Sequence, residues 1–454
     1  MALVPFPYFE PDKSRFNGKA TQVALNCIPT ADGWGPMPSL VAVSGALPAE
    51  VRGSIAVRTD AGTWKIYCGT AANLYVISSV NYTFSEISRS TDGYSLAADV
   101  HWSFELFGTL LIATAVGSDF PQFIDIASGS AFANLTNATF EASVVWRTGD
   151  FLVFGGIDGE ERDLRWSGVN DATYWTNGKR GADAQTLPDL GPIQRGIVQA
   201  KSSVIFQADG IREMLFDPST GFTFHFHIVD PSRGAYAGRS VVNVGAGDFV
   251  FLAKDGFYRN GTPIGTERVD KFFWNLASSP ELTEGVADPY DTLIWWRFSD
   301  VGGTSYLLGY NWQLDRWMFS DSDASNLLAA ATPGYTLEGL DAFGNVDTLP
   351  YSLDNRFWKG GLLGFAGFTA DFKFGFFSGP NLEAVIETED KALNYPRRAI
   401  TDRTLVLADT DLAEVNIGVK ETQAGTLVYS GYASQEASNP FITTQRSGRI
   451  HRYR

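Results

Sequence analysis

The sequence predicts an all-β fold: a β-propeller of six or seven blades with an extended N-terminal arm and a C-terminal β-domain. Composition is the first observation, because 14% of the 454 residues are aromatic and only 19% are charged, against about 25% charged in a typical globular domain. The second is the 46 glycines and 20 prolines, which punctuate short apolar runs as turns punctuate strands. The third is a unit that recurs roughly every 45 residues, the spacing of a four-stranded propeller blade.

Residues 1–50 are predicted to form the extended arm. Prolines recur from Pro5 to Pro48, and Gly33 and Gly35 lie between them. Proline fixes φ and removes a backbone donor, so such a segment stays extended. We expect the arm to lie along another surface and to contribute little core of its own.

Residues 51–360 are predicted to form the propeller. In each unit an apolar alternating run is followed by a glycine-bearing turn and a second run that contains aromatics. Six units are clear and a seventh is weaker: 54–78, 104–126, 143–169, 196–216, 240–260, 285–319 and 328–358. Asp158-Gly159, Asp209-Gly210 and Asp255-Gly256 separate β-rich runs, and Asp-Gly supplies the positive φ that tight hairpins need. A pair of β-sandwiches with hairpins at similar spacing is the alternative.

Residues 361–454 are predicted to form a separate β-domain. Alternating or apolar runs cover 368–377, 382–390, 404–422, 426–434 and the last residues, 449–454. Helical patterns are scarce along the whole chain. The best candidate is the short segment 279–284, because proline is tolerated in a first helical turn.

The charge balance is acidic. Asp and Glu outnumber Lys and Arg by 51 to 35, a formal net charge of −16. This argues against a tight nucleic-acid binder, which needs a basic stripe, whereas an acidic surface lets DNA pass without sticking. The N-terminal residues lack the regions of a signal peptide. The longest uncharged run, 66–85, is too polar for a membrane span, so we expect no stable membrane insertion.

No catalytic, cofactor-binding or metal-binding residue is predicted. Cys27 and Cys68 are too few for a disulfide framework or a cysteine zinc site, and both are expected to be packed thiols. His225 and His227 would share one face of a strand and could begin a metal site. No third ligand lies near them in the sequence, so an aromatic strand with two polar ring edges is the favoured interpretation.

Two features could indicate carbohydrate chemistry. Glu160, Glu161 and Asp163 could supply the paired carboxylates of a glycosidase, but they follow Asp158-Gly159 and fit a solvated hairpin tip better. The aromatic clusters around Trp295 could form a carbohydrate platform, but packing between blades is favoured. The sequence holds no phosphate-binding glycine loop and no serine-nucleophile elbow. We therefore expect that the protein is not an enzyme and needs no cofactor.

Several short stretches follow one another in a fixed order over most of the chain. They include Ala24-Leu-Asn-Cys-Ile-Pro29, Asp150-Phe-Leu-Val-Phe-Gly-Gly156, Arg165-Trp-Ser-Gly-Val-Asn-Asp171, Asp255-Gly-Phe-Tyr258, Ile294-Trp-Trp296, Tyr310-Asn-Trp312, Phe376-Phe-Ser-Gly-Pro-Asn-Leu382 and Gly448-Arg-Ile-His-Arg-Tyr453. In this order the stretches resemble the tail hub, or nozzle, of short-tailed bacteriophages, a family also called packaged-DNA stabilisation protein.

The resemblance implies a propeller-bearing structural subunit of a homo-hexameric ring in the phage tail, assembled in the host cytoplasm. Such a ring lies below the portal and its adaptor, extends the DNA channel, helps to retain the packaged genome and conducts it during ejection without sequence-specific binding. It implies a tail needle or plug and tail fibres or spikes as partners, and no catalytic residues. Two other classes stay open: a glycoside hydrolase acting on host surface polysaccharide, and a carbohydrate- or receptor-binding propeller.

The one basic cluster in the sequence lies at its C-terminal end. It consists of Arg446, Arg449, Arg452 and Arg454. Because side chains alternate along a strand, Arg449 and Arg452 are expected on opposite faces. We therefore expect these arginines to meet an acidic neighbour or solvent, and not to grip DNA.

Overall fold

The computed structural model describes residues 3–16, 20–78, 81–91, 93–199, 202–245, 247–289, 291–331, 363–410, 412–435 and 441–454. Regular structure in these ranges is almost entirely β. The helices are α1 (Asp270–Leu276) and the 3-10 turns η1 (Pro218–Thr220), η2 (Gly238–Ser240) and η3 (Pro280–Leu282). The all-β prediction is confirmed, and the segment 279–284 holds only the single turn η3.

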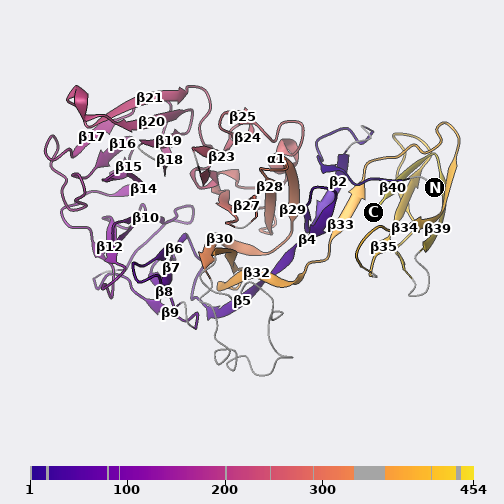
Figure 1. The fold of residues 1–454 in the computed structure, drawn as a ribbon, viewed down its shortest axis with the longest axis horizontal. Coiled ribbons are helices and arrows are strands. Elements are labelled where there is room, and N and C mark those ends of the chain that lie inside the picture. The colour runs from indigo at the N-terminus through magenta and orange to yellow at the C-terminus, as the bar shows by residue number, and fades with distance from the viewer. Residues whose placement is uncertain are drawn as a thin grey trace.

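Five four-stranded antiparallel sheets follow one another along the chain and form blades 1 to 5 (Figure 1). Blade 1 contains β6 (Ser54–Arg58), β7 (Trp64–Gly69), β8 (Leu74–Ile77) and β9 (Phe84–Glu86). Blade 2 contains β10 (Ser103–Phe107), β11 (Leu110–Thr114), β12 (Gln122–Asp125) and β13 (Ala133–Asn134). Blade 3 contains β14 (Ala142–Thr148), β15 (Phe151–Ile157), β16 (Glu160–Trp166) and β17 (Asp183–Thr186).

Blades 4 and 5 repeat the same order. Blade 4 contains β18 (Ile193–Val198), β19 (Ser202–Gln207), β20 (Ile211–Phe216) and β21 (Phe224–Asp230). Blade 5 contains β22 (Val242–Gly245), β23 (Asp248–Ala253), β24 (Gly256–Arg259) and β25 (Thr262–Pro263). Neighbours in sequence are neighbours in the sheet throughout, so each blade forms from local hairpins.

Blades 6 and 7 recruit strands from distant parts of the chain. Blade 6 is β26 (Glu284–Ala287), β27 (Leu293–Ser299), β28 (Ser305–Asn311) and β29 (Arg316–Ser320), and its sheet continues through β2 (Ala20–Leu25) to β1 (Tyr8–Phe9) and β33 (Val385–Thr388). Blade 7 is β30 (Ala324–Ala331), β31 (Leu363–Thr369), β32 (Lys373–Asn381) and an outer strand, β5 (Pro38–Ala46). The hairpin of β3 (Cys27–Pro29) and β4 (Trp34–Pro36) links β2 to β5.

The seven blades close into a ring. The first strand of each blade lies beside the first strand of a neighbouring blade along most of the ring, and β30 lies beside β6. Figure 1 shows these inner strands gathered around the middle of the propeller. The architecture is therefore a seven-bladed propeller, within the predicted range of six or seven, and not a pair of sandwiches. The six clear sequence units each fall within one of blades 1 to 6.

The sheets differ from the predicted boundaries at residues 50 and 360. The 1–50 segment does not lie apart from the propeller, because β2 enters the blade 6 sheet and β5 completes blade 7. Strands β31 and β32, predicted to belong to the 361–454 domain, are also part of blade 7. Most of the predicted seventh unit, from 332 onward, lies outside the described residues. The pairing of β5 with β32 is non-local, so no local sequence pattern reveals it.

Large aromatic side chains pack between the blades. Trp296 and Trp317 are fully buried together with Phe257 of blade 5 and Phe273 of α1. Trp146 of blade 3 lies over Gly196 of the neighbouring inner strand, where an added Cβ would fall 2.1 Å from the indole ring. A glycine is needed there because the ring occupies the space of a side chain. The aromatic clusters thus pack between blades, as favoured, and Trp295 is buried against Phe365.

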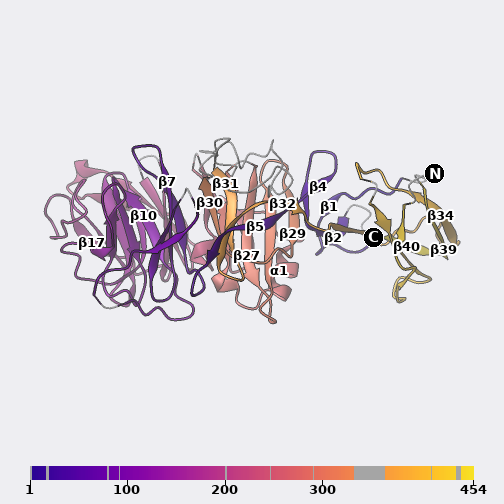
Figure 2. The ribbon, with the colours of Figure 1, turned by 90° about the horizontal axis from the view of Figure 1, so that it is seen from below.

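The remaining strands form a C-terminal domain beyond blade 6. They are β34 (Ala399–Leu405), β35 (Glu414–Val415), β36 (Ile417–Lys420), β37 (Val428–Tyr429), β38 (Ala433–Ser434), β39 (Phe441–Gly448) and β40 (Ile450–Tyr453). They pair only in sheets of two or three strands. Val4 and Phe6 from the N-terminal segment pack on the small core of this domain. Figure 2 shows the domain at one end of the elongated molecule.

Candidate functional site

The two histidines lie where the sequence predicted, on one face of strand β21. Their ring centroids are 6.5 Å apart and the rings are close to parallel, at 22°. Within the described ranges, no group of three or more His, Cys, Asp or Glu side chains is arranged to hold a metal ion. The neighbouring Phe224 is buried in the core between blades 3 and 4, so β21 is an aromatic outer strand.

The two cysteines are buried thiols. Burial raises the pKa of Cys27 to about 12, and it raises the pKa of the Cys68 thiol further still. A nucleophilic cysteine requires a thiolate, which a lowered pKa supplies. Both thiols stay protonated at neutral pH and serve the packing of their strands.

The carboxylates proposed as a possible glycosidase pair lie on a hairpin. Glu160 and Glu161 are exposed at the start of β16. Asp158 and Gly159 form the tip with φ of 50° and 84°, as predicted for Asp-Gly. Asp209-Gly210, in contrast, joins β19 to β20 without a left-handed residue at either position, so that part of the turn prediction is wrong.

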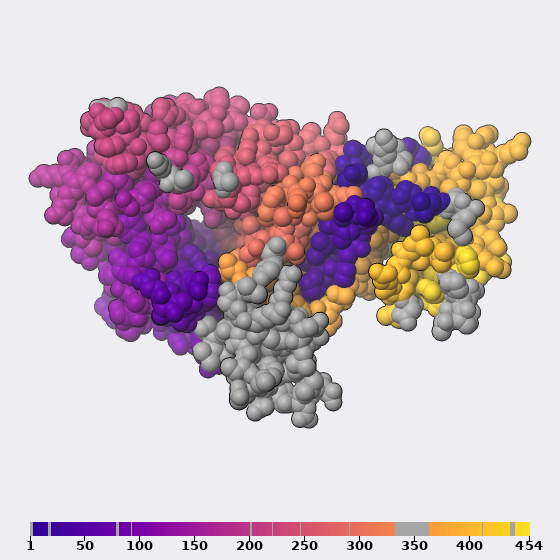
Figure 3. Space-filling model, in the orientation of Figure 1, coloured from indigo at the N-terminus to yellow at the C-terminus, as the bar shows by residue number. Residues whose placement is uncertain are grey.

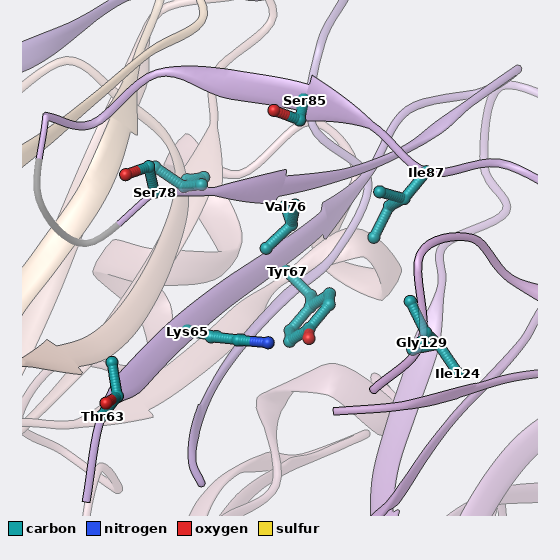
Figure 4. Close-up of a pocket in the computed structure, with 10 residues that line it drawn as sticks. Thr63, Lys65, Tyr67, Val76, Ser78, Ser85, Ile87, Ile124 and Gly129 are labelled. Carbon is teal, nitrogen blue, oxygen red and sulfur yellow. The ribbon is translucent and has the colours of Figure 1, made fainter. Parts of the chain in front are cut away.

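A cavity of about 280 Å³ lies between blades 1 and 2 (Figure 4). Lys65 and Tyr67 of β7 lie side by side at its centre. The Lys65 ammonium donates to the carbonyl of Ile126 at 2.6 Å, and burial raises the pKa of Tyr67 to about 12. A backbone carbonyl thus holds the Lys65 ammonium, and the Tyr67 hydroxyl stays protonated at neutral pH.

Charged side chains from several blades interact with one another near the centre of the propeller. We name the channel arginines Arg52, Arg147, Arg195, Arg239 and Arg297, which belong to, or immediately precede, strands of blades 1, 3, 4, 5 and 6. Figure 3 shows an opening in the middle of the ring. Interactions between blades that are not neighbours can pass only through this centre, so they identify the side chains that point into it.

Such interactions across the ring are present. Arg195 of blade 4 interacts electrostatically with Glu105 of blade 2 and with Glu284 of blade 6. His101, which precedes blade 2, interacts electrostatically with Arg239 of blade 5 and Arg297 of blade 6. These side chains therefore converge on one volume.

Part of this charge is neutralised within the channel. The Arg239 Nη2 atom lies 2.7 Å from Glu284 Oε1, which also accepts a 2.7 Å hydrogen bond from Asn326. Arg297 Nε donates to Ser305 and to the carbonyl of Ala324, both at 3.2 Å. Arg195 has no hydrogen bond or ion pair with any residue that the structure describes.

Burial and the charges in the channel shift the pKa values of two titratable groups, His101 and Glu105. Burial lowers the pKa of His101 to about 3, and Arg239, Arg52 and Arg297 lower it as well. Burial raises the pKa of Glu105 to about 7, although Arg147 and Arg195 oppose that shift. His101 is therefore neutral at physiological pH, and Glu105 is close to half protonated.

A second charged group is buried in the C-terminal domain. Arg452 Nη2 lies 2.7 Å from Asp390 Oδ1, and its Nη1 lies 3.1 Å from Glu387 Oε1. Lys420 Nζ lies 2.6 Å from Asp390 Oδ2. Arg452 thus meets acidic partners within its own chain, whereas the exposed Arg449 lies 3.7 Å from Glu421. This cluster ties β40 and β36 to the segment that follows β33.

Exposed apolar side chains concentrate in the same domain. Of the 20 large apolar residues that are exposed among those described, nine lie between residues 393 and 432. They are Leu393, Tyr395, Ile400, Leu405, Leu407, Leu412, Val428, Tyr429 and Tyr432. Blade 4 carries a smaller group around its outer strand: Phe216, Phe222, Ile228 and Val229. Concentrated exposed apolar surface is typical of protein contact sites.

Comparison with known proteins gives only distant likenesses to solved structures. No family model matches the chain, and no curated protein matches it. The WD40 domain of Pan2 from Neurospora crassa is 10% identical over 63% of this chain and 86% of that one, with a TM-score of 0.38. Virginiamycin B lyase from Staphylococcus aureus is 8% identical over 62% and 87%, with a TM-score of 0.37.

A third similar structure is much longer than the matched region. The extracellular domain of a one component system from B. thetaiotaomicron is 14% identical over 60% of this chain, with a TM-score of 0.36. The match spans only 40% of that protein's chain.

Among the described residues, no helix has the length and apolar character needed to cross a membrane.

Proposed function

We propose that this protein is a structural subunit of a phage virion, the hexameric tail hub that extends the DNA channel below the portal and adaptor. The ordered resemblance along the sequence suggests the family. The observation that supports an assembly role is the concentration of exposed apolar side chains in the C-terminal domain. This domain has only small sheets and a small core of its own, so contact with another subunit would cover surface that the monomer leaves in water.

A closed ring needs two different surfaces that fit each other. Head-to-tail rings use heterologous interfaces, in which one patch of a subunit meets another patch of the next. The C-terminal domain offers one surface, and the outer strand of blade 4, with Ile228 and Val229, offers a second. The two surfaces lie far apart in the molecule (Figure 1), so one subunit could present them to two different neighbours.

The acidic balance agrees with a DNA conduit. A formal charge of −16 for each subunit repels the phosphate backbone and lets DNA slide past the wall. In this proposal the genome passes through the lumen of the ring without sequence-specific binding. A tail needle or plug and fibres or spikes would attach to the assembled ring.

The test measures assembly directly. Mass measurement and electron microscopy of the purified protein are expected to give six-fold rings, alone or with the adaptor. Replacing Ile400 and Leu412 by Asp is expected to leave monomers with an unchanged fold, because both side chains are exposed. The matched control is Val301→Asp, which alters an equally exposed residue on the β27–β28 hairpin.

Two outcomes would contradict the proposal. One is a protein that stays monomeric at every concentration and with the adaptor present. The other is release of reducing sugar from host envelopes by the purified chain, which would favour the glycoside hydrolase alternative. A ring that survives the double Asp variant would instead show that the subunit interface lies elsewhere.

A further inference from the structure

We propose that the central channel of the propeller binds a compact oxyanion with two or more negative charges, held by the channel arginines around Arg195. This site is independent of the assembly role. Its ligand class follows from charge, because five guanidinium groups face Glu105 and Glu284 within the channel. Glu50 and Asp323 also interact electrostatically with Arg297, but both are exposed.

The arrangement leaves guanidinium groups available for a ligand. Arg239 is paired with Glu284, and Arg52 donates to the carbonyls of Leu96 and Ala97. Arg195 and Arg147 have no such partner among the residues that the structure describes. An unpaired charge inside a protein is costly, and burial lowers the pKa of Arg195, whereas Arg147 is exposed. An anion bound to Arg195 would therefore offset the cost of burying its charge.

The recognition chemistry is that of guanidinium and oxyanion. Guanidinium groups bind carboxylate and phosphate through two parallel charge-assisted hydrogen bonds. Arg195 interacts electrostatically with Arg239, and also with Glu284 and Glu105, so an anion bound by Arg195 and Arg239 would relieve the repulsion between the two guanidinium groups. His101 is neutral there and can donate or accept a hydrogen bond without opposing the anion.

Other polar side chains beside the channel are already bonded to one another. Ser54 of blade 1 donates to Asn326 of blade 7 at 2.6 Å, and Asn326 donates to Glu284 of blade 6. These bonds join three neighbouring blades and leave the unpaired guanidinium groups as the donors for a ligand. Pyrophosphate and a tricarboxylate share the required chemistry, and the experiment separates them.

The experiment is calorimetric titration of the full chain with pyrophosphate and, separately, with citrate, at pH 8 and pH 6. One of the two anions is expected to bind with one-to-one stoichiometry, and the tighter one identifies the source. Arg195→Gln is expected to weaken binding about tenfold to a hundredfold, the usual effect of losing a charged hydrogen bond. Arg180→Gln is the matched control, because Arg180 pairs with Asp171 outside the channel.

A second variant keeps the test independent of folding. Glu105→Gln removes a negative charge beside Arg195 and is expected to tighten binding several-fold at pH 8, with little change at pH 6, where Glu105 is already largely protonated. A gain in affinity cannot come from a misfolded protein. The proposal is overturned if neither anion binds at millimolar concentration, if Arg195→Gln binds as the unaltered chain does, or if Arg180→Gln weakens binding equally.

Discussion

The propeller and the C-terminal domain differ in which side chains they bury and which they expose. The propeller buries its largest apolar groups, among them Trp146, Trp296 and Trp317, between neighbouring blades. The C-terminal domain has a small core and exposes nine large apolar side chains, yet it encloses the ion pairs of Arg452. From this difference we infer that the propeller is self-sufficient, whereas the C-terminal domain is shaped for contact with another molecule.

The N-terminal segment belongs to both regions. Phe9 is part of the core between blades 5 and 6, and Val4 and Phe6 pack on the core of the C-terminal domain. Strands β2 and β5 then run into the sheets of blades 6 and 7. The segment joins the two regions and closes the ring, so its removal tests the comparison most severely.

Deleting residues 1–49 is expected to have the largest effect. The deletion removes the outer strand of blade 7, the β2 strand of the blade 6 sheet and the buried Phe9 and Met37. The free energy of unfolding of a domain is only about 5–15 kcal/mol, and we expect the deletion to remove most of it. Urea unfolding followed by tryptophan fluorescence measures the change.

The matched control for this deletion removes the other region. A chain that ends at residue 390 loses β34 to β40 but keeps all seven blades, so its propeller is expected to unfold cooperatively near the original midpoint. A 1–49 deletion that unfolds at the same midpoint would show that the arm is dispensable, as the sequence pattern alone suggested.

The repeats could be predicted from the sequence because blades 1 to 5, and strands β26 to β29 of blade 6, pair locally. Alternation and glycine turns mark the hairpins of blades 1 to 6, since their strands pair in chain order. Blade 7 could not be completed in this way, because β5 and β32 come from opposite ends of the chain. Periodicity says nothing about such long-range pairing.

The channel arginines were missed for a related reason. They come from different blades and converge only when the ring closes. One pattern could have revealed part of the group: Arg147, Arg195 and Arg239 follow one another at intervals of 48 and 44 residues, close to the blade repeat. The C-terminal ion pairs were likewise hidden, because Arg452 meets Glu387 and Asp390 across some sixty residues of sequence.

Arg452→Met is expected to have the next largest effect on stability, and this effect is expected to stay within the C-terminal domain. Removing one partner of a buried ion pair costs about 3–5 kcal/mol, because the remaining charge is left uncompensated. Glu387 would lose its guanidinium partner, whereas Asp390 keeps Lys420, so we expect a loss at the lower end of this range. Hydrogen exchange is expected to show lost protection in β36 and β40, with the blades unchanged.

The control for this variant is Arg449→Met. Arg449 is half exposed and lies 3.7 Å from Glu421, and exposed pairs contribute about 0–1 kcal/mol. Its stability is expected to match that of the unaltered chain. An equal loss of stability in both variants would contradict the role of the buried ion pairs. A loss of hydrogen-exchange protection that extends through the blades would mean that the two regions unfold as one unit.

The smallest expected effect is the change of the propeller's stability with pH. It arises from Glu105 in the channel, whereas the buried carboxylates of the C-terminal domain are paired with Arg452 and Lys420. Burial raises the pKa of Glu105 to about 7, above its value in an unfolded chain, about 4.3. The folded state then binds this proton more tightly than the unfolded state, so stability falls as pH rises from about 4.5 to 7. We expect a change of the order of 1 kcal/mol, since each pKa unit corresponds to about 1.4 kcal/mol and water at the channel mouth screens part of it. Glu105→Gln is expected to flatten this slope in urea unfolding between pH 5 and 8, because the amide does not titrate. An unchanged slope in the variant would assign the pH dependence to other groups and would remove Glu105 from the electrostatics of the channel.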